Sequence, residues 1–112
     1  MDKEMGILAG KLVNDLELLQ RHLLMLKLVA ENEPIGIIKL SEMLKLPQHK
    51  VRYSLRLLEQ DGLLEATNAG AKITDRLIPF LQNLGQQMDS MASSIKNIQK
   101  AVEEVRSARA RK

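Results

Sequence analysis

The side chains best suited to bind a charged partner gather in one short stretch near the middle of this chain. These residues are Gln48, His49, Lys50, Arg52, Tyr53 and Arg56. Lysine and arginine neutralise phosphates, and the arginine fork can donate two hydrogen bonds to one planar group. The spacing of Val51, Leu55 and Leu58 at i, i+4 and i+7 predicts a helix whose other side carries the charged group. We therefore expect a helix with one apolar face against a core and one basic face toward a polyanion.

Positive charge is concentrated in two segments, although the net charge of the whole chain is only +3. Residues 39–56 hold five Lys or Arg against the single acid Glu42, and residues 106–112 hold four Lys or Arg and no acid. The remaining segments are net negative. Local clustering of this kind indicates a polyanionic partner more strongly than the total charge does. We expect the second segment to form a frayed basic tail that attracts phosphates without regard to sequence.

No pattern in the sequence supports catalysis or metal binding. The chain has no cysteine, and its two histidines, His22 and His49, fall on different predicted elements. The carboxylates show no acid–base pairing, and no Gly-rich loop joins a strand to a helix. We expect a protein that is not an enzyme and needs no metal or cofactor. The absence of a long apolar run and of a signal peptide favours a cytoplasmic protein with no membrane partner.

Predicted elements surround the basic helix on both sides. The predicted order is a helix over 2–31, a strand over 34–38, a short helix over 42–45, the basic helix over 47–61, strands over 63–66 and 71–73, and a last helix from Thr74. Ser41 suits the N-cap of the short helix, and Leu46-Pro47 forms the turn before the basic helix. Gly62 ends the basic helix because glycine adopts the left-handed conformation cheaply.

One run of residues carries a family resemblance. The segment LEQDGLLE, from Leu58 to Glu65, followed by a hairpin and by Thr74, resembles the recognition helix and wing of winged helix-turn-helix DNA-binding proteins. MarR-like, ArsR-like and PadR-like regulators share this sequence pattern, as do small archaeal winged-helix proteins with a dimerising C-terminal helix. The resemblance covers about residues 16–78. It implies a mainly α fold with a small β-hairpin wing, and contact of the basic helix and Lys72 with double-stranded DNA.

Both long helices carry an apolar seam in steps of four and three, which is typical of coiled coils. In the first helix the seam is Met5, Ala9, Leu12, Leu16, Leu19, Leu23, Leu26 and Ala30. In the last it is Leu77, Leu81, Leu84, Met88, Met91, Ile95, Ile98, Val102 and Val105. We expect the second seam, together with Leu12, Leu16 and Leu19, to form a coiled-coil or bundle-like homodimer interface. Packing of the two helices within one chain is the alternative.

The predicted organisation is a helical extension over 1–15, a DNA-binding domain over 16–76, a dimerisation helix over 77–105 and the basic tail over 106–112. The function expected from it is a homodimeric, nucleoid-associated transcriptional regulator that places the basic helix in the major groove. An architectural DNA binder of low sequence specificity is one alternative. A winged helix used only for protein assembly is the other.

Overall fold

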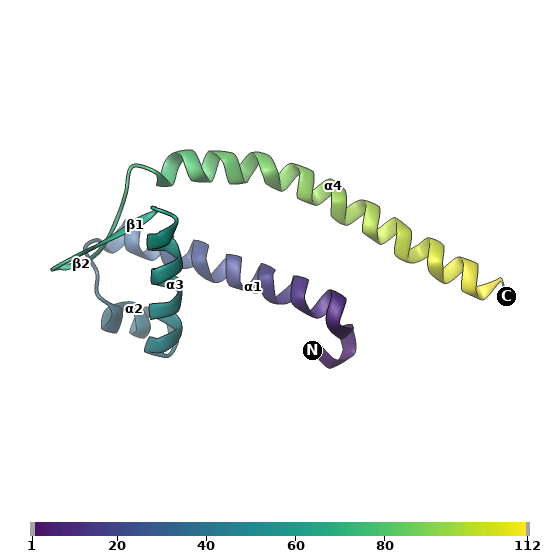
Figure 1. Cartoon of the computed structure of the whole chain (residues 1–112), viewed down its shortest axis with the longest axis horizontal. Coiled ribbons are helices and arrows are strands. Elements are labelled where there is room, and N and C mark those ends of the chain that lie inside the picture. The colour runs from purple at the N-terminus through teal and green to yellow at the C-terminus, as the bar shows by residue number, and fades with distance from the viewer. Residues whose placement is uncertain (1, 112) are drawn as a thin grey trace. The chain divides into compact units, whose positions relative to one another are not determined.

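The computed structural model describes residues 2–111, which form four helices and one antiparallel hairpin (Figure 1). The elements are α1 (Asp2–Asn32), α2 (Ile37–Leu44), α3 (Gln48–Gln60), β1 (Leu64–Thr67), β2 (Gly70–Ile73) and α4 (Leu77–Ala110). The mainly helical α+β class expected from the sequence is confirmed. The side chain of Met5, predicted to belong to the seam of the first helix, lies outside the described part of the chain, as does the whole of Lys112 in the predicted basic tail.

The chain forms two compact units, one ending at Leu77 and the other beginning at Ile78. Within the first unit, α1, α2, α3 and the hairpin share one core of aliphatic side chains. Its buried members are Met25, Leu26, Val29, Ile35, Leu40, Val51, Leu58, Leu63, Leu64 and Leu77. Each fully buried Val or Leu stabilises the fold by about 1.5–3 kcal/mol relative to an exposed one. The predicted apolar side of α3 therefore faces this core, with Leu55 half-buried at its edge.

The start of α2 differs from the prediction. The helix begins at Ile37, after Gly36 in extended geometry, and the N–H of Leu40 donates to the Gly36 carbonyl at 3.1 Å. Ser41 is therefore not the N-cap. It lies inside the helix, where its hydroxyl donates to the Leu46 carbonyl at 2.5 Å. Burial of Leu40 in the core outweighs the weak helix propensity of the two β-branched isoleucines at the helix start.

The predicted strand over 34–38 is reduced to one residue. Ile35 forms an isolated antiparallel bridge with Ala71 of β2, and Ile37 already belongs to α2. In this bridge the Ile35 N–H donates to Ala71 O at 3.1 Å, and the Ala71 N–H donates to Ile35 O at 2.8 Å. Near the same point the Ile73 N–H donates to Glu33 Oε2 at 2.7 Å. The segment after α1 thus holds the hairpin in place beside the core.

The turn between α2 and α3 is tight, and its residue Lys45 has a left-handed backbone conformation. Lys45 has a φ of 56°, and its N–H and that of Leu46 both donate to the Ser41 carbonyl. Helix α3 follows Pro47 directly and ends at Gln60, within one residue of the predicted bounds. Gly62 then takes a φ of 77° and leads into β1. Local sequence signals thus set both ends of α3.

α4 is one continuous helix of 34 residues, Leu77–Ala110, and all of it except Leu77 belongs to the second unit. The prediction of a frayed tail after Val105 is wrong. Arg106 pairs with Glu103 at 3.1 Å, and the Arg111 N–H donates to Ser107 O at 3.2 Å. Leu77 is also wrongly assigned to the dimerisation seam, since its side chain is only 8% exposed in the first unit.

Candidate nucleic-acid interface

All six predicted site residues of α3 are exposed to solvent. Val51, Ser54 and Leu58 are buried on the opposite side of the helix. The burial of that side holds α3 against the core and fixes which of its residues reach solvent. The exposed residues are Gln48, His49, Lys50, Arg52, Tyr53 and Arg56. Tyr53 is 49% exposed, so the ring is available to a partner as well as to its helical neighbours.

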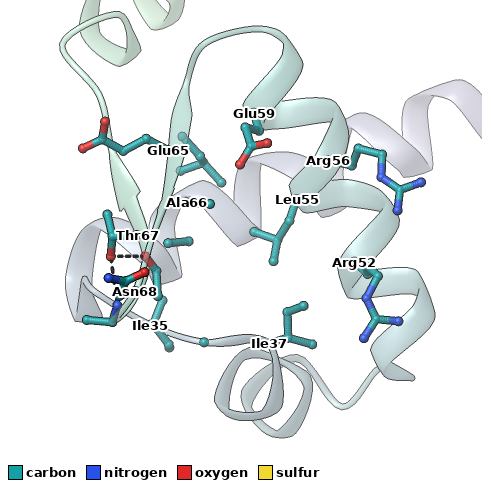
Figure 2. A pocket seen from close by; sticks show the side chains of 15 residues that line it. Ile35, Ile37, Arg52, Leu55, Arg56, Glu59, Glu65, Ala66, Thr67 and Asn68 are labelled. Carbon is teal, nitrogen blue, oxygen red and sulfur yellow. Dashed lines mark hydrogen bonds between the residues drawn. The ribbon is translucent and has the colours of Figure 1, made fainter.

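A first hollow lies between α3 and the hairpin, and we call it the hairpin hollow (Figure 2). Its volume is about 410 Å³, and its lining includes Ile35, Ile37 and Leu55. In Figure 2 the Leu55 and Ile37 side chains approach each other, whereas the guanidinium groups of Arg52 and Arg56 lie on the side away from the hairpin. The two arginines therefore form the outer edge of this hollow.

A second hollow lies on the α1 side of α3, and we call it the basic hollow. It measures about 540 Å³ and is lined by Arg21, His49, Lys50, Arg52, Tyr53 and Arg56. Five of the six predicted α3 residues thus meet in one place, joined by an arginine from α1. None of the lining residues is an acid. The hollow is suited to an anion because its four Lys and Arg side chains raise the local positive potential.

The arginines of this surface form no ion pair with a carboxylate among the described residues, although Glu59 and Glu65 line the hairpin hollow with Arg52 and Arg56. Among the side chains that the structure describes, the ion pairs are Lys11–Asp15 and Glu103–Arg106, and both lie far along the chain from α3. Arg52 and Arg56 make no hydrogen bond or ion pair among the described residues. An unpaired guanidinium at the surface keeps all five of its N–H donors for a partner.

Gln48 and Lys72 lie apart from the basic hollow. Gln48 lines a separate shallow hollow with Arg52 and with Lys39 and Glu42 of α2. Lys72 lies on β2 in register with Glu65 of β1, and it lines neither of these hollows nor the basic one. The structure therefore groups five of the seven predicted DNA-contacting residues and leaves the hairpin lysine away from them.

Sequence reasoning missed Arg21 as a member of this surface. Its Nε–H donates to the buried Ser54 hydroxyl at 3.0 Å, which joins α1 to α3. The sequence contained only a weak indication that Arg21 belongs to this surface. Arg21 is a polar residue in a largely apolar helical stretch, and the sequence does not say which neighbouring helix it faces.

His22 lies next to Arg21 in sequence but is not among the residues that line the basic hollow. Its side chain is half-buried, and its Nε2 is buried without a hydrogen-bond partner among the described residues. Burial lowers the pKa of His22, the charge of Arg21 lowers it further, and Asp61 opposes both. The described residues contain no cluster of three side chains that could hold a metal ion.

The predicted dimerisation residues of α4 beyond Leu77 form an apolar stripe, exposed over most of its length, in the second unit. From Met88 to Val105, the seam residues on α4 are between 45% and 69% exposed. Leu81 is 38% exposed and Leu84 is half-buried. On α1, Leu12 and Leu16 are 53% and 41% exposed, whereas Leu19 is half-buried. Among residues 2–111, no helix has both the length and the apolar character needed to cross a membrane.

Comparison with known proteins adds no relative. No protein-family model matches the chain, and a search of curated proteins finds no match.

Proposed function

We propose that this protein is a homodimeric winged-helix DNA-binding regulator that inserts α3 into the major groove. The observation that carries this proposal is the basic, unpaired face of α3. It presents Lys50, Arg52 and Arg56 to solvent, while the opposite face of the same helix is buried in the core. A helix held by one face and basic on the other matches what a recognition helix requires.

The order of elements supports the same proposal. α2, a tight turn at Lys45 and α3 form two consecutive short helices, and an antiparallel hairpin follows them. This order agrees with the resemblance seen in the segment from Leu58 to Glu65. The hairpin plays the part of the wing, but it carries only Lys72 as a basic residue, so α3 supplies most of the contact.

Arg52 and Arg56 are the residues we assign to base reading or phosphate contact. They are four residues apart, about one helical turn, and so project from neighbouring positions along α3. The major groove, about 12 Å wide, admits a helix, and arginine pairs with the O6 and N7 acceptors of guanine there. Lys50, His49, Tyr53 and Gln48 complete the proposed contact surface.

The α4 stripe is the proposed dimer interface. A single helix with a continuous exposed seam over several heptads has little stability in water on its own, and it gains by burying that seam against a second copy. A dimer would present two α3 helices to one duplex, which doubles the contact area for each binding event.

One observation favours the architectural alternative. The end of α4 carries Arg106, Arg109 and Arg111, and such a cluster attracts phosphates of any sequence. The test must therefore separate sequence-specific from sequence-independent binding.

The decisive experiment measures binding of fluorescent duplex DNA by anisotropy at several salt concentrations. Random duplexes come first, followed by duplexes selected from a random pool. Arg52→Ala, Arg56→Ala and the double variant are compared with Lys96→Ala/Lys100→Ala, which removes two positive charges from exposed positions on α4 off its apolar seam. The Arg52/Arg56 double variant should keep its helicity, because neither side chain is in the core.

For the double variant we expect a large loss of affinity, since each lost base contact removes about 1–3 kcal/mol. In a regulator, one of the two single variants loses discrimination between sequences while the other weakens all sequences alike. Uniform losses at both arginines would identify an architectural binder. A folded double variant that binds DNA as tightly as the parent would overturn the proposal and favour the assembly module.

A further inference from the structure

We propose that Arg21 of α1 is a DNA-backbone contact, and that the basic hollow holds one phosphodiester group while α3 lies in the groove. This inference rests on the proposed function and extends it to a second helix. It assigns a binding role to a residue whose position on the surface depends on the packing of α1 against α3.

Arg21 is held in place by a contact within the fold. Its Nε–H donates to Ser54 Oγ at 3.0 Å, and Ser54 is fully buried. The bond uses one of the five guanidinium N–H donors and leaves the four on Nη1 and Nη2. Among the described residues, no carboxylate pairs with Arg21. A positioned guanidinium loses less conformational freedom on binding than a free side chain does.

The surroundings of Arg21 select an anion. Within the basic hollow it joins Lys50, Arg52 and Arg56, and no carboxylate lines the hollow. Four cations around one open space repel one another, so an anion bound there gains from all four charges. The geometry of a guanidinium fork matches two oxygens of one phosphate.

Its place in the fold favours the DNA backbone over a base edge. His49 and Arg56 lie on the side of α3 opposite the buried Val51 and Leu58, so their side chains would lie deepest in the groove when α3 binds. Arg21 belongs to a neighbouring helix that packs against the buried flank of α3 at Ser54. A side chain displaced in this way from the tip of the recognition helix meets the groove wall, where the phosphates run.

The test compares two variants that differ only at Arg21. Replacing Arg21 alone would leave the buried Ser54 hydroxyl without its partner, which costs stability. We therefore compare Ser54→Ala with Arg21→Ala/Ser54→Ala, because neither variant leaves that hydroxyl buried without its partner. Lys27→Ala serves as the charge control, since it removes one exposed cation from the same helix at a position off the basic hollow. Circular dichroism confirms that each variant is folded.

We expect the slope of log affinity against log salt to fall by about 0.9 in the double variant relative to Ser54→Ala. Between about 50 and 200 mM salt, this difference corresponds to a roughly 3.5-fold smaller loss of affinity. Binding should weaken by the same factor for every duplex, with the ratio between two sequences unchanged. Lys27→Ala should change the slope far less.

An unchanged slope in the double variant, or a change equal to that of Lys27→Ala, would overturn the role of Arg21. A changed preference between sequences would overturn the backbone assignment. In each of these cases a strong effect of Arg52→Ala/Arg56→Ala would leave the proposed function standing. If the parent protein bound no duplex DNA at any salt concentration, both proposals would fall.

Discussion

The contact between Gly70 and Ile35 makes Gly70→Ala the most sharply determined perturbation of this fold. Gly70 has a φ of 132°, a conformation that side chains rarely allow. A Cβ added there would lie 2.5 Å from the Ile35 carbonyl carbon, 2.7 Å from its oxygen and 2.8 Å from its nitrogen. These are backbone atoms, so no rotamer change relieves the contact. The hairpin must either carry the strain or move away from Ile35.

Either response destabilises the first unit. Retaining the strained backbone costs about 1–3 kcal/mol before the clash is counted. Moving the hairpin breaks the two hydrogen bonds between Ile35 and Ala71, each worth about 0.5–1.5 kcal/mol, and exposes part of the buried Ile35 side chain. We expect the free energy of unfolding to fall by about 2–4 kcal/mol, and the melting temperature by at least about 8 °C.

Two other glycine substitutions calibrate this effect. Gly62 has a φ of 77°, but its added Cβ would meet only the flexible end of Arg76, so Gly62→Ala should cost about 1–2 kcal/mol. Gly36 is an extended N-cap with nothing within 4 Å of an added Cβ. Gly36→Ser should therefore be neutral or slightly stabilising.

Thermal and urea unfolding followed by far-UV circular dichroism would measure this series. The chain has no Trp and a single Tyr, so fluorescence is a weak probe. All variants should be measured at one protein concentration, because the stability of the proposed dimer would depend on concentration. A Gly70→Ala protein that unfolds at the same midpoint as Gly36→Ser would refute the reasoning, since it would show that the hairpin does not depend on close approach to Ile35.

Two further predictions concern the α4 seam and the half-buried His22. Ile95→Asp places a charge in the apolar stripe of α4, so light scattering should show monomers for this variant. The control Asn97→Asp adds the same charge on the other side of the helix and should leave the proposed dimer intact. A parent protein that is monomeric at micromolar concentration would contradict the proposed dimer. Because burial lowers the pKa of His22 below its ordinary value of 6.5, the unfolded chain binds a proton more readily than the folded one. The free energy of unfolding should therefore be highest above pH 6.5 and fall as the pH is lowered below that value. His22→Leu should weaken this pH dependence, which melting curves recorded at several pH values would measure. An equal change of melting temperature with pH in both proteins would show that His22 does not cause the dependence.

Periodic and local signals in the sequence were enough to predict much of the fold. The i, i+4, i+7 spacing of Val51, Leu55 and Leu58 placed α3 and its apolar side, because a helix repeats every 3.6 residues whatever it packs against. Gly62 predicted the end of that helix, and the strands predicted over 63–66 and 71–73 correspond to β1 and β2 of the hairpin. These features depend on neighbours in sequence, so they can be read without knowledge of the rest of the chain.

Other features were decided only by tertiary packing. The helix α2 starts at Ile37 because Leu40 is buried in the core, and the capping preference of Ser41 is too weak to move that start. Leu77 fits the heptad of α4 in sequence, yet it packs in the first unit. Arg21 joins the basic face through Ser54, a contact between residues 33 positions apart. Periodicity in the sequence shows which side of a helix is apolar and which is polar. Which other element covers each side depends on the tertiary packing of the whole chain.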